Sequence, residues 1–156
     1  MKFIALLLLS VSLSAIADDQ HVYLLAKVKI KDTTFASIVF LYEKDIKDLQ
    51  SCERNLLYGH QGNWQYYRHF VKKSTGFAKS VNYFCVQTDK IIDSWYDNAK
   101  YDYVYLVDLR KNELKIKLTE HYSDCMSLLR KEQEQESHKF FCSRANQKVI
   151  DRNTDA

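Results

Sequence analysis

Four cysteines constrain this chain more than any other feature of its sequence. They stand at Cys52, Cys85, Cys125 and Cys142. Four cysteines allow three different disulfide pairings, whereas in a reducing compartment the same residues would suggest metal binding or catalysis. Their chemistry therefore depends on where the protein matures.

The N-terminus predicts export. Lys2 supplies a positive charge, residues 3–13 form an apolar segment, and the sequence Ala-Ile-Ala that ends at Ala17 has the small-x-small pattern of a signal-peptidase site. The apolar segment is shorter than the ~20 residues that span a membrane. We therefore expect residues 1–17 to be a signal peptide and residues 18–156 to form one mature domain in the periplasm or outside the cell.

Two alternative roles for the cysteines are disfavoured. His121 and His138 each precede a cysteine by four residues, which resembles a spacing of zinc ligands. The second pair falls in an expected strand, where four residues span about 13 Å, too far for one ion. No local motif surrounds any cysteine that would activate it as a nucleophile. We expect no metal site, no cofactor and two disulfides.

Similar short segments in the two halves indicate an internal duplication. Four landmarks recur in the same order: Val22-Tyr23-Leu24-Leu25 with Val104-Tyr105-Leu106-Val107, Leu49-Gln50-Ser51-Cys52 with Tyr122-Ser123-Asp124-Cys125, Asn82-Tyr83-Phe84-Cys85 with Lys139-Phe140-Phe141-Cys142, and Lys90-Ile91-Ile92 with Lys148-Val149-Ile150. Apolar periodicity predicts strands at 21–31, 34–42, 80–88, 102–109, 113–118 and 138–144, and helices at 44–58 and 121–136, the second capped by Thr119.

These elements predict an α+β fold of two duplicated β-β-α-β units with antiparallel sheet, at about 21–92 and 102–150. Each unit has one cysteine on its helix and one on the following strand. A helix that packs on a sheet brings such positions within bridging distance. The expected disulfides are therefore Cys52–Cys85 and Cys125–Cys142, each tying a helix to its sheet. The pattern leaves open whether the units form one continuous sheet or two lobes.

The first unit is longer than the second by 16 residues, because its cysteines are 33 positions apart and those of the second are 17 apart. The extra segment, 58–73, is rich in aromatic and basic residues. Tryptophan, tyrosine and arginine dominate the energetics of many protein interfaces. The candidate binding residues are Trp64, Tyr66, Tyr67, Arg68 and His69. Alternatively, these aromatics form a second small core.

The sequence favours a non-enzymatic binding or inhibitor-type protein whose partner is another exported or envelope protein. A net charge of +3 is too balanced to predict binding to nucleic acid, and no segment after the signal is apolar enough to span a membrane. The oligomeric state is not indicated. The alternative is a small secreted hydrolase that uses groups of the 58–73 and 93–103 segments. Its candidate residues are His60 or His69 with Asp93, Asp97 or Asp102.

Overall fold

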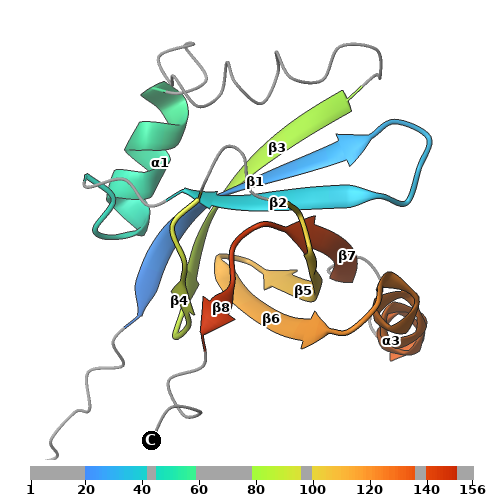
Figure 1. The fold of residues 1–156 in the computed structure, drawn as a ribbon. Helices are drawn as coiled ribbons and strands as arrows, with labels where there is room; N and C mark the ends of the chain where they lie inside the picture. Colours follow the sequence, from blue (N-terminus) through green and yellow to red (C-terminus); the bar gives the residue numbers. More distant parts are fainter. Residues whose placement is uncertain (1–19, 42–44, 59–78, 96–99, 136–139, 151–156) are drawn as a thin grey trace, which may run out of the picture.

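The computed structural model describes residues 20–41, 45–58, 79–95, 100–135 and 140–150 (Figure 1). The expected signal peptide, 1–17, lies outside the described residues. In chain order the elements are β1 (His21–Ile30), β2 (Ala36–Leu41), α1 (Leu49–Tyr58), β3 (Lys79–Thr88), β4 (Ile91–Ile92), β5 (Tyr103–Arg110), β6 (Glu113–Thr119), α3 (Tyr122–Gln135), β7 (Phe140–Ala145) and β8 (Val149–Ile150).

Six of these strands close into a barrel in the order β1-β2-β7-β5-β6-β3. Within it, β1 pairs with β2 and β3, and β5 pairs with β6 and β7, all antiparallel. The two three-stranded groups join through parallel contacts with one residue pair each, Ser37 with Arg144 and Gln87 with Glu113. The remaining strands, β4 and β8, form a separate two-stranded sheet.

The predicted α+β fold of two duplicated β-β-α-β units is wrong. The described chain is mostly β, and six of its strands form a single closed barrel with two short helices outside it. The physical reason lies in the burial of the central strands. Val22 to Ala26 of β1 and Val104 to Asp108 of β5 are buried on both faces. One face of each strand points into the barrel, and the other packs against a helix.

The interior of the barrel is filled with side chains. Its core includes Tyr23, Leu25, Phe40, Tyr105 and Val107, contributed by strands of both groups. Filling an interior at the density of an organic crystal maximises dispersion contacts and apolar burial. The barrel therefore encloses a packed core.

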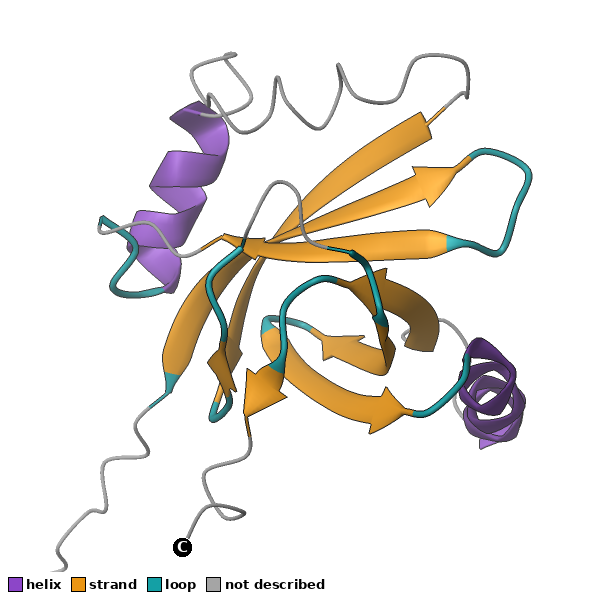
Figure 2. Ribbon diagram, viewed as in Figure 1, coloured by secondary structure: helices purple, strands orange, loops and turns teal. Residues whose placement is uncertain are grey.

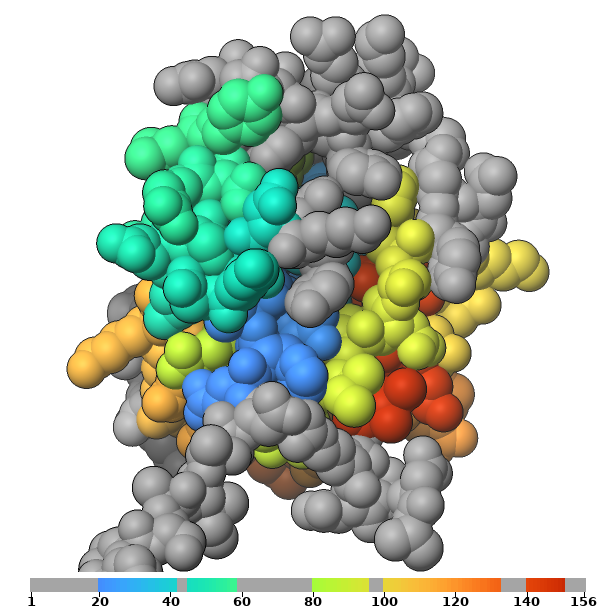
Figure 3. All heavy atoms as spheres, turned by 90° about the vertical axis from the view of Figure 1, so that its left-hand side faces the viewer, coloured from blue at the N-terminus to red at the C-terminus, as the bar shows by residue number. Residues whose placement is uncertain are grey.

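A helix covers the outer face of each three-stranded group (Figure 2). Each is held by a disulfide in the expected pairing, and this prediction is confirmed. Cys52 of α1 bonds to Cys85 of β3, and Cys125 of α3 bonds to Cys142 of β7, with Cα–Cα distances of 5.8 and 5.9 Å. Figure 3 shows the face covered by α1, below which the atoms of β1 adjoin those of the β4 and β8 region.

Hydrogen bonds to side chains fix the start of each helix. The Ser51 N–H donates to Oδ1 of Asp48, and the Asp48 N–H donates to Oγ of Ser51. The Ser51 contacts hold the pKa of the Asp48 carboxyl below its ordinary value. At α3, the His121 N–H donates to Oδ2 of Asp124. Thr119, the expected cap, instead lies in β6 and donates its hydroxyl to the Val104 carbonyl.

Candidate binding surface

The predicted binding residues lie outside the described residues. Trp64, Tyr66, Tyr67, Arg68 and His69 all belong to 59–78. The interpretation of segment 58–73 as a binding surface or as a second core therefore stays a prediction.

The predicted hydrolytic groups are only partly described. His60, His69 and Asp97 lie outside the described residues, whereas Asp93 and Asp102 are exposed. The backbone of Asp93 has a structural role, because its N–H donates to the Lys148 carbonyl at 2.9 Å and its carbonyl accepts from Gln147 at 2.8 Å. Among the described residues, no three His, Cys, Asp or Glu side chains cluster as metal ligands, and no helix is long and apolar enough to cross a membrane.

One end of the barrel is closed by the β4–β8 pair. The Tyr23 hydroxyl accepts the Ile92 N–H at 3.1 Å, which holds β4 against the core. The Tyr105 hydroxyl accepts the Val149 N–H at 3.0 Å and donates to the Gln147 carbonyl at 3.1 Å. Two tyrosines inside the barrel thus pair with backbone groups that would otherwise be buried without partners.

The side chain of Gln147 also helps to close this end of the barrel. Its Oε1 accepts the Phe40 N–H at 2.7 Å, and its Nε2 donates to the carbonyls of Phe40 and Asp93, both at 2.8 Å. The side chain therefore substitutes for a neighbouring strand beside β2. Gln147 is 1% exposed, so these bonds form out of contact with water.

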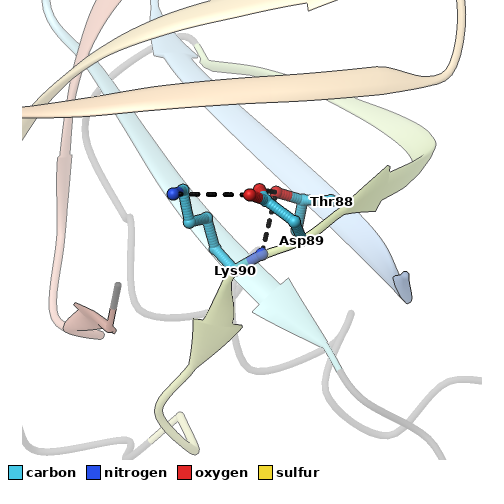
Figure 4. Close-up of polar contacts among 3 residues, drawn as sticks. All are labelled: Thr88, Asp89 and Lys90. Atoms are coloured by element: carbon cyan, nitrogen blue, oxygen red, sulfur yellow. Dashed lines mark hydrogen bonds and ion pairs between the residues drawn. The ribbon is translucent and has the colours of Figure 1, made fainter. Parts of the chain in front are cut away.

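The turn that leads into β4 is shown in Figure 4. The buried Thr88 hydroxyl accepts the Lys90 N–H at 3.3 Å, and Lys90 Nζ lies 3.5 Å from Oδ2 of Asp89. Exposed ion pairs of this kind contribute little stability. These residues set the direction of the chain between β3 and β4.

A groove of about 270 Å³ runs between β5, β6 and the C-terminal half of α3. Within it, the Arg110 guanidinium binds the buried Asp108 carboxylate through Nε and through Nη2 at 2.9 Å, and it lies 5.5 Å from the centre of the Phe140 ring. The rest of the lining consists of three charged residues, Lys115, Lys117 and Glu132, and two apolar ones, Leu106 and Ile116. Charges of both signs and an arginine already held by Asp108 give this groove no preference for one class of ligand.

An aromatic pair with one exposed ring lies where the β1–β2 hairpin approaches α3. Phe35 is 50% exposed, and its ring stacks on that of Tyr122 at 5.2 Å between centroids. The Tyr122 hydroxyl donates to the Thr34 carbonyl at 2.8 Å. Burial raises the pKa of Tyr122, and the positive charge of Arg144 acts in the opposite direction. The pair presents a large apolar ring to solvent in a fixed position.

The loop that carries Phe35 is ordered by its own hydrogen bonds. The Thr33 hydroxyl donates to the Ile30 carbonyl at 2.9 Å and accepts the Phe35 N–H at 3.3 Å. Asp32 adopts a φ of 62°, a conformation that aspartate tolerates better than most residues. A ring that is already ordered loses little conformational entropy when a partner covers it.

Sequence reasoning did not identify Phe35 or Tyr122 as candidates. Both are single aromatic residues in otherwise ordinary surroundings, and 88 positions separate Tyr122 from its hydrogen-bond partner Thr34. Only the arrangement of the hairpin beside α3 brings them together. No protein-family model, no curated protein and no solved structure matches this chain.

Proposed function

We propose that this is an exported protein that acts by binding another exported or envelope protein, and that Phe35 and Tyr122 form part of the contact. The observation that carries the proposal is the half-exposed Phe35 ring, which is held in place by Tyr122 and by the bonds of Thr33. Exposed aromatics on ordered loops are typical of the residues that dominate binding energy.

The two disulfides support the exported location. Stable disulfides form in the periplasm and outside the cell, whereas cytosolic thiols are kept reduced. Cys52–Cys85 and Cys125–Cys142 both have a Cα separation typical of disulfide bonds. The same compartments contain the partners proposed here.

Export is tested by the mass and N-terminal sequence of the protein recovered from its source organism. We expect a product that begins at Asp18, found in the periplasmic fraction or the medium. A product that retains residues 1–17 and stays in the cytosol contradicts export, without bearing on whether the folded domain binds a protein.

Binding is tested with purified mature protein that carries a photo-crosslinking phenylalanine analogue at position 35. A control protein carries the same group at position 57, because Leu57 is 65% exposed at the end of α1. Irradiation in envelope or medium fractions is expected to give a discrete adduct from position 35 and none from position 57.

Competition by unlabelled protein makes the test specific. Excess wild type and the Tyr122→Phe variant, which keeps the stacked ring, are expected to suppress the adduct. Phe35→Ala is expected to compete at least tenfold less well, since loss of one buried aromatic contact corresponds to roughly that change in affinity. Equal competition by Phe35→Ala, or equal labelling from position 57, contradicts the proposal.

A further inference from the structure

The barrel-facing side of β1 changes from apolar to cationic along its length. Alternate residues of a strand share one face, so Tyr23, Leu25, Lys27 and Lys29 follow one another on the same side. Tyr23 and Leu25 are buried in the barrel core, whereas Lys27 is half-buried and Lys29 is exposed. Lys27 lies four residues beyond Tyr23, about 13 Å away. The lysines therefore lie away from the end that β4 and β8 close.

Polar groups lie beside both lysines. Lys27 pairs with Asn82 of β3, and Lys29 pairs with Ser80 of the same strand. Directly paired residues of antiparallel strands have side chains on the same face. Asn82 and Ser80 are exposed, and both side chains carry hydrogen-bond donors. Two ammonium groups, an amide and a hydroxyl therefore share one small area of the sheet.

Lys27 has an aromatic partner. Its Nζ lies 3.5 Å from the centre of the Phe141 ring, which packs against the barrel core. This cation–π contact offsets part of the cost of burial. It holds the ammonium group at the edge of the core, where a carboxylate would normally be required to balance it.

Neither lysine has a carboxylate partner among the described residues, since no ion pair involves Lys27 or Lys29. Burial lowers the pKa of Lys27, and the positive charge of Lys29 lowers it further. Two like charges on one face of a strand are mutually unfavourable. Two positive charges on this face therefore have no carboxylate partner among the described residues, and one of them, on Lys27, is half-buried.

We propose that Lys27 and Lys29 form a binding site for a phosphate dianion, either free or as a phosphate monoester. Residues two apart on a strand are separated by about 6.6 Å, so both ammonium groups reach one tetrahedral oxyanion between them. A dianion balances both charges, whereas a carboxylate balances one. Asn82 and Ser80 are positioned to donate to its remaining oxygens. This proposal does not rest on the protein-binding function.

The test is a titration of the mature, disulfide-bonded protein with inorganic phosphate, followed by amide chemical shifts. Sodium chloride at equal ionic strength is the blank. We expect saturable shifts around Lys27, Lys29 and Asn82, with an affinity in the millimolar range typical of a single small anion, on the order of 1 mM. Shifts that do not saturate, or that sodium chloride reproduces, would overturn the proposal.

Three variants locate the site. Lys27→Met and Lys29→Met each remove a charge and keep an apolar stem, and each is expected to weaken phosphate binding roughly tenfold or more. Lys131→Met removes an exposed charge from α3 and is expected to change nothing. Lys27→Met also removes a half-buried charge, so its folding is favoured. An equal loss of affinity in Lys131→Met would show general attraction only and would overturn the site.

A second titration, with glucose 6-phosphate, distinguishes a site for free phosphate from a site for a phosphate monoester. Equal affinities for inorganic phosphate and for the ester assign the site to the phosphate group alone. Tighter binding of the ester, lost in Lys27→Met, assigns it to phosphate carried on a larger molecule. Phosphate affinity that is unchanged in both Lys27→Met and Lys29→Met would overturn either assignment.

Discussion

The phenol of Tyr105 donates a hydrogen bond to the carbonyl oxygen of Gln147, with the two oxygens 3.1 Å apart. Tyr105 is 1% exposed, and burial raises its pKa to about 12, although the bond from the Val149 N–H acts in the opposite direction. The closed end of the barrel therefore depends on a tyrosine that must stay protonated.

We predict that stability falls between about pH 10 and pH 12 through the ionisation of Tyr105. The folded pKa is raised, so the contribution is complete below the unfolded pKa of 10 and is lost as the pH rises through the folded value of about 12. A shift of two pKa units corresponds to at most about 3 kcal/mol, and partial solvent screening makes the expected loss smaller. Urea unfolding from pH 9 to pH 12 measures it. Other groups also titrate in this range. The comparison is therefore between the slopes of unfolding free energy against pH in wild type and in Tyr105→Phe. Equal slopes would contradict the assignment to Tyr105.

Gln147→Ala is expected to destabilise the protein by about 2–4 kcal/mol, because it leaves the N–H and carbonyl of Phe40 buried without their partner. Gln147→Glu is expected to be worse, since a carboxylate would replace the amide that donates to two carbonyls. Urea unfolding at pH 7 measures the free energy of unfolding of both variants. Gln50→Ala, at an exposed position of α1, is the control and should lie within about 0.5 kcal/mol of wild type.

Removing the two disulfides separately should cost similar free energies. The Cys125–Cys142 bond spans 17 residues and the Cys52–Cys85 bond spans 33, for which chain entropy gives about 3 and about 4 kcal/mol. Paired Cys→Ala variants compared by urea unfolding test these two values, and a difference of more than about 2 kcal/mol between them would contradict the chain-entropy explanation. Non-reducing peptide mapping checks the connectivity itself, and a peptide that joins Cys52 to Cys125 would refute it.

Lys111→Gly is expected to stabilise the protein by roughly 0.5–1 kcal/mol. Lys111 begins the two-residue turn between the paired residues Arg110 and Glu113, and its φ of 54° is unfavourable for a residue with a Cβ atom. The same change at Lys131, inside α3, should destabilise by about 1 kcal/mol. Thermal unfolding of the two variants should therefore show shifts of opposite sign, and a lower melting temperature for Lys111→Gly would argue against strain at this turn.

The local structure could be predicted well from the sequence, because it depends on periodicity within short segments. The strand predicted at 80–88 is observed at Lys79–Thr88, and that predicted at 113–118 is observed at Glu113–Thr119. The helix predicted at 44–58 begins later, at Leu49, because Asp48 caps its N-terminus. The disulfide pairing followed from placing each cysteine on the correct element.

The barrel could not be predicted in this way. Its closure depends on two isolated contacts, Ser37 with Arg144 and Gln87 with Glu113, and the first joins residues more than 100 positions apart. Neither contact leaves a periodic signal. A sequence signal was nevertheless present in residues 22–26, where five consecutive apolar residues indicate a strand buried on both faces. Alternating burial, as expected for a sheet open on one side, does not produce such a run.

The candidate sites were harder still to predict. The aromatic residues at 64–69 could be identified as candidates from composition alone. Phe35 and Tyr122 are identified only by the exposure of Phe35 and by the stacking of the two rings. Lys27 and Lys29 alternate with apolar residues, as the solvent-facing side of any strand would. Their significance comes from the direction of that face, which points toward the barrel, and from Phe141, which lies more than 100 positions further along the chain.

The incomplete pairing of β6 has a consequence for how the protein tolerates high concentration. β6 pairs with β5 along its whole length but with β3 only at Glu113, so among the described strands the rest of its other edge has no strand partner. Strand edges without a partner can template aggregation between molecules. Lys115 and Lys117 are exposed along this strand, and their charges repel an incoming strand from a second copy. We therefore expect that replacing both lysines with apolar residues promotes self-association at this edge while leaving the barrel core unchanged.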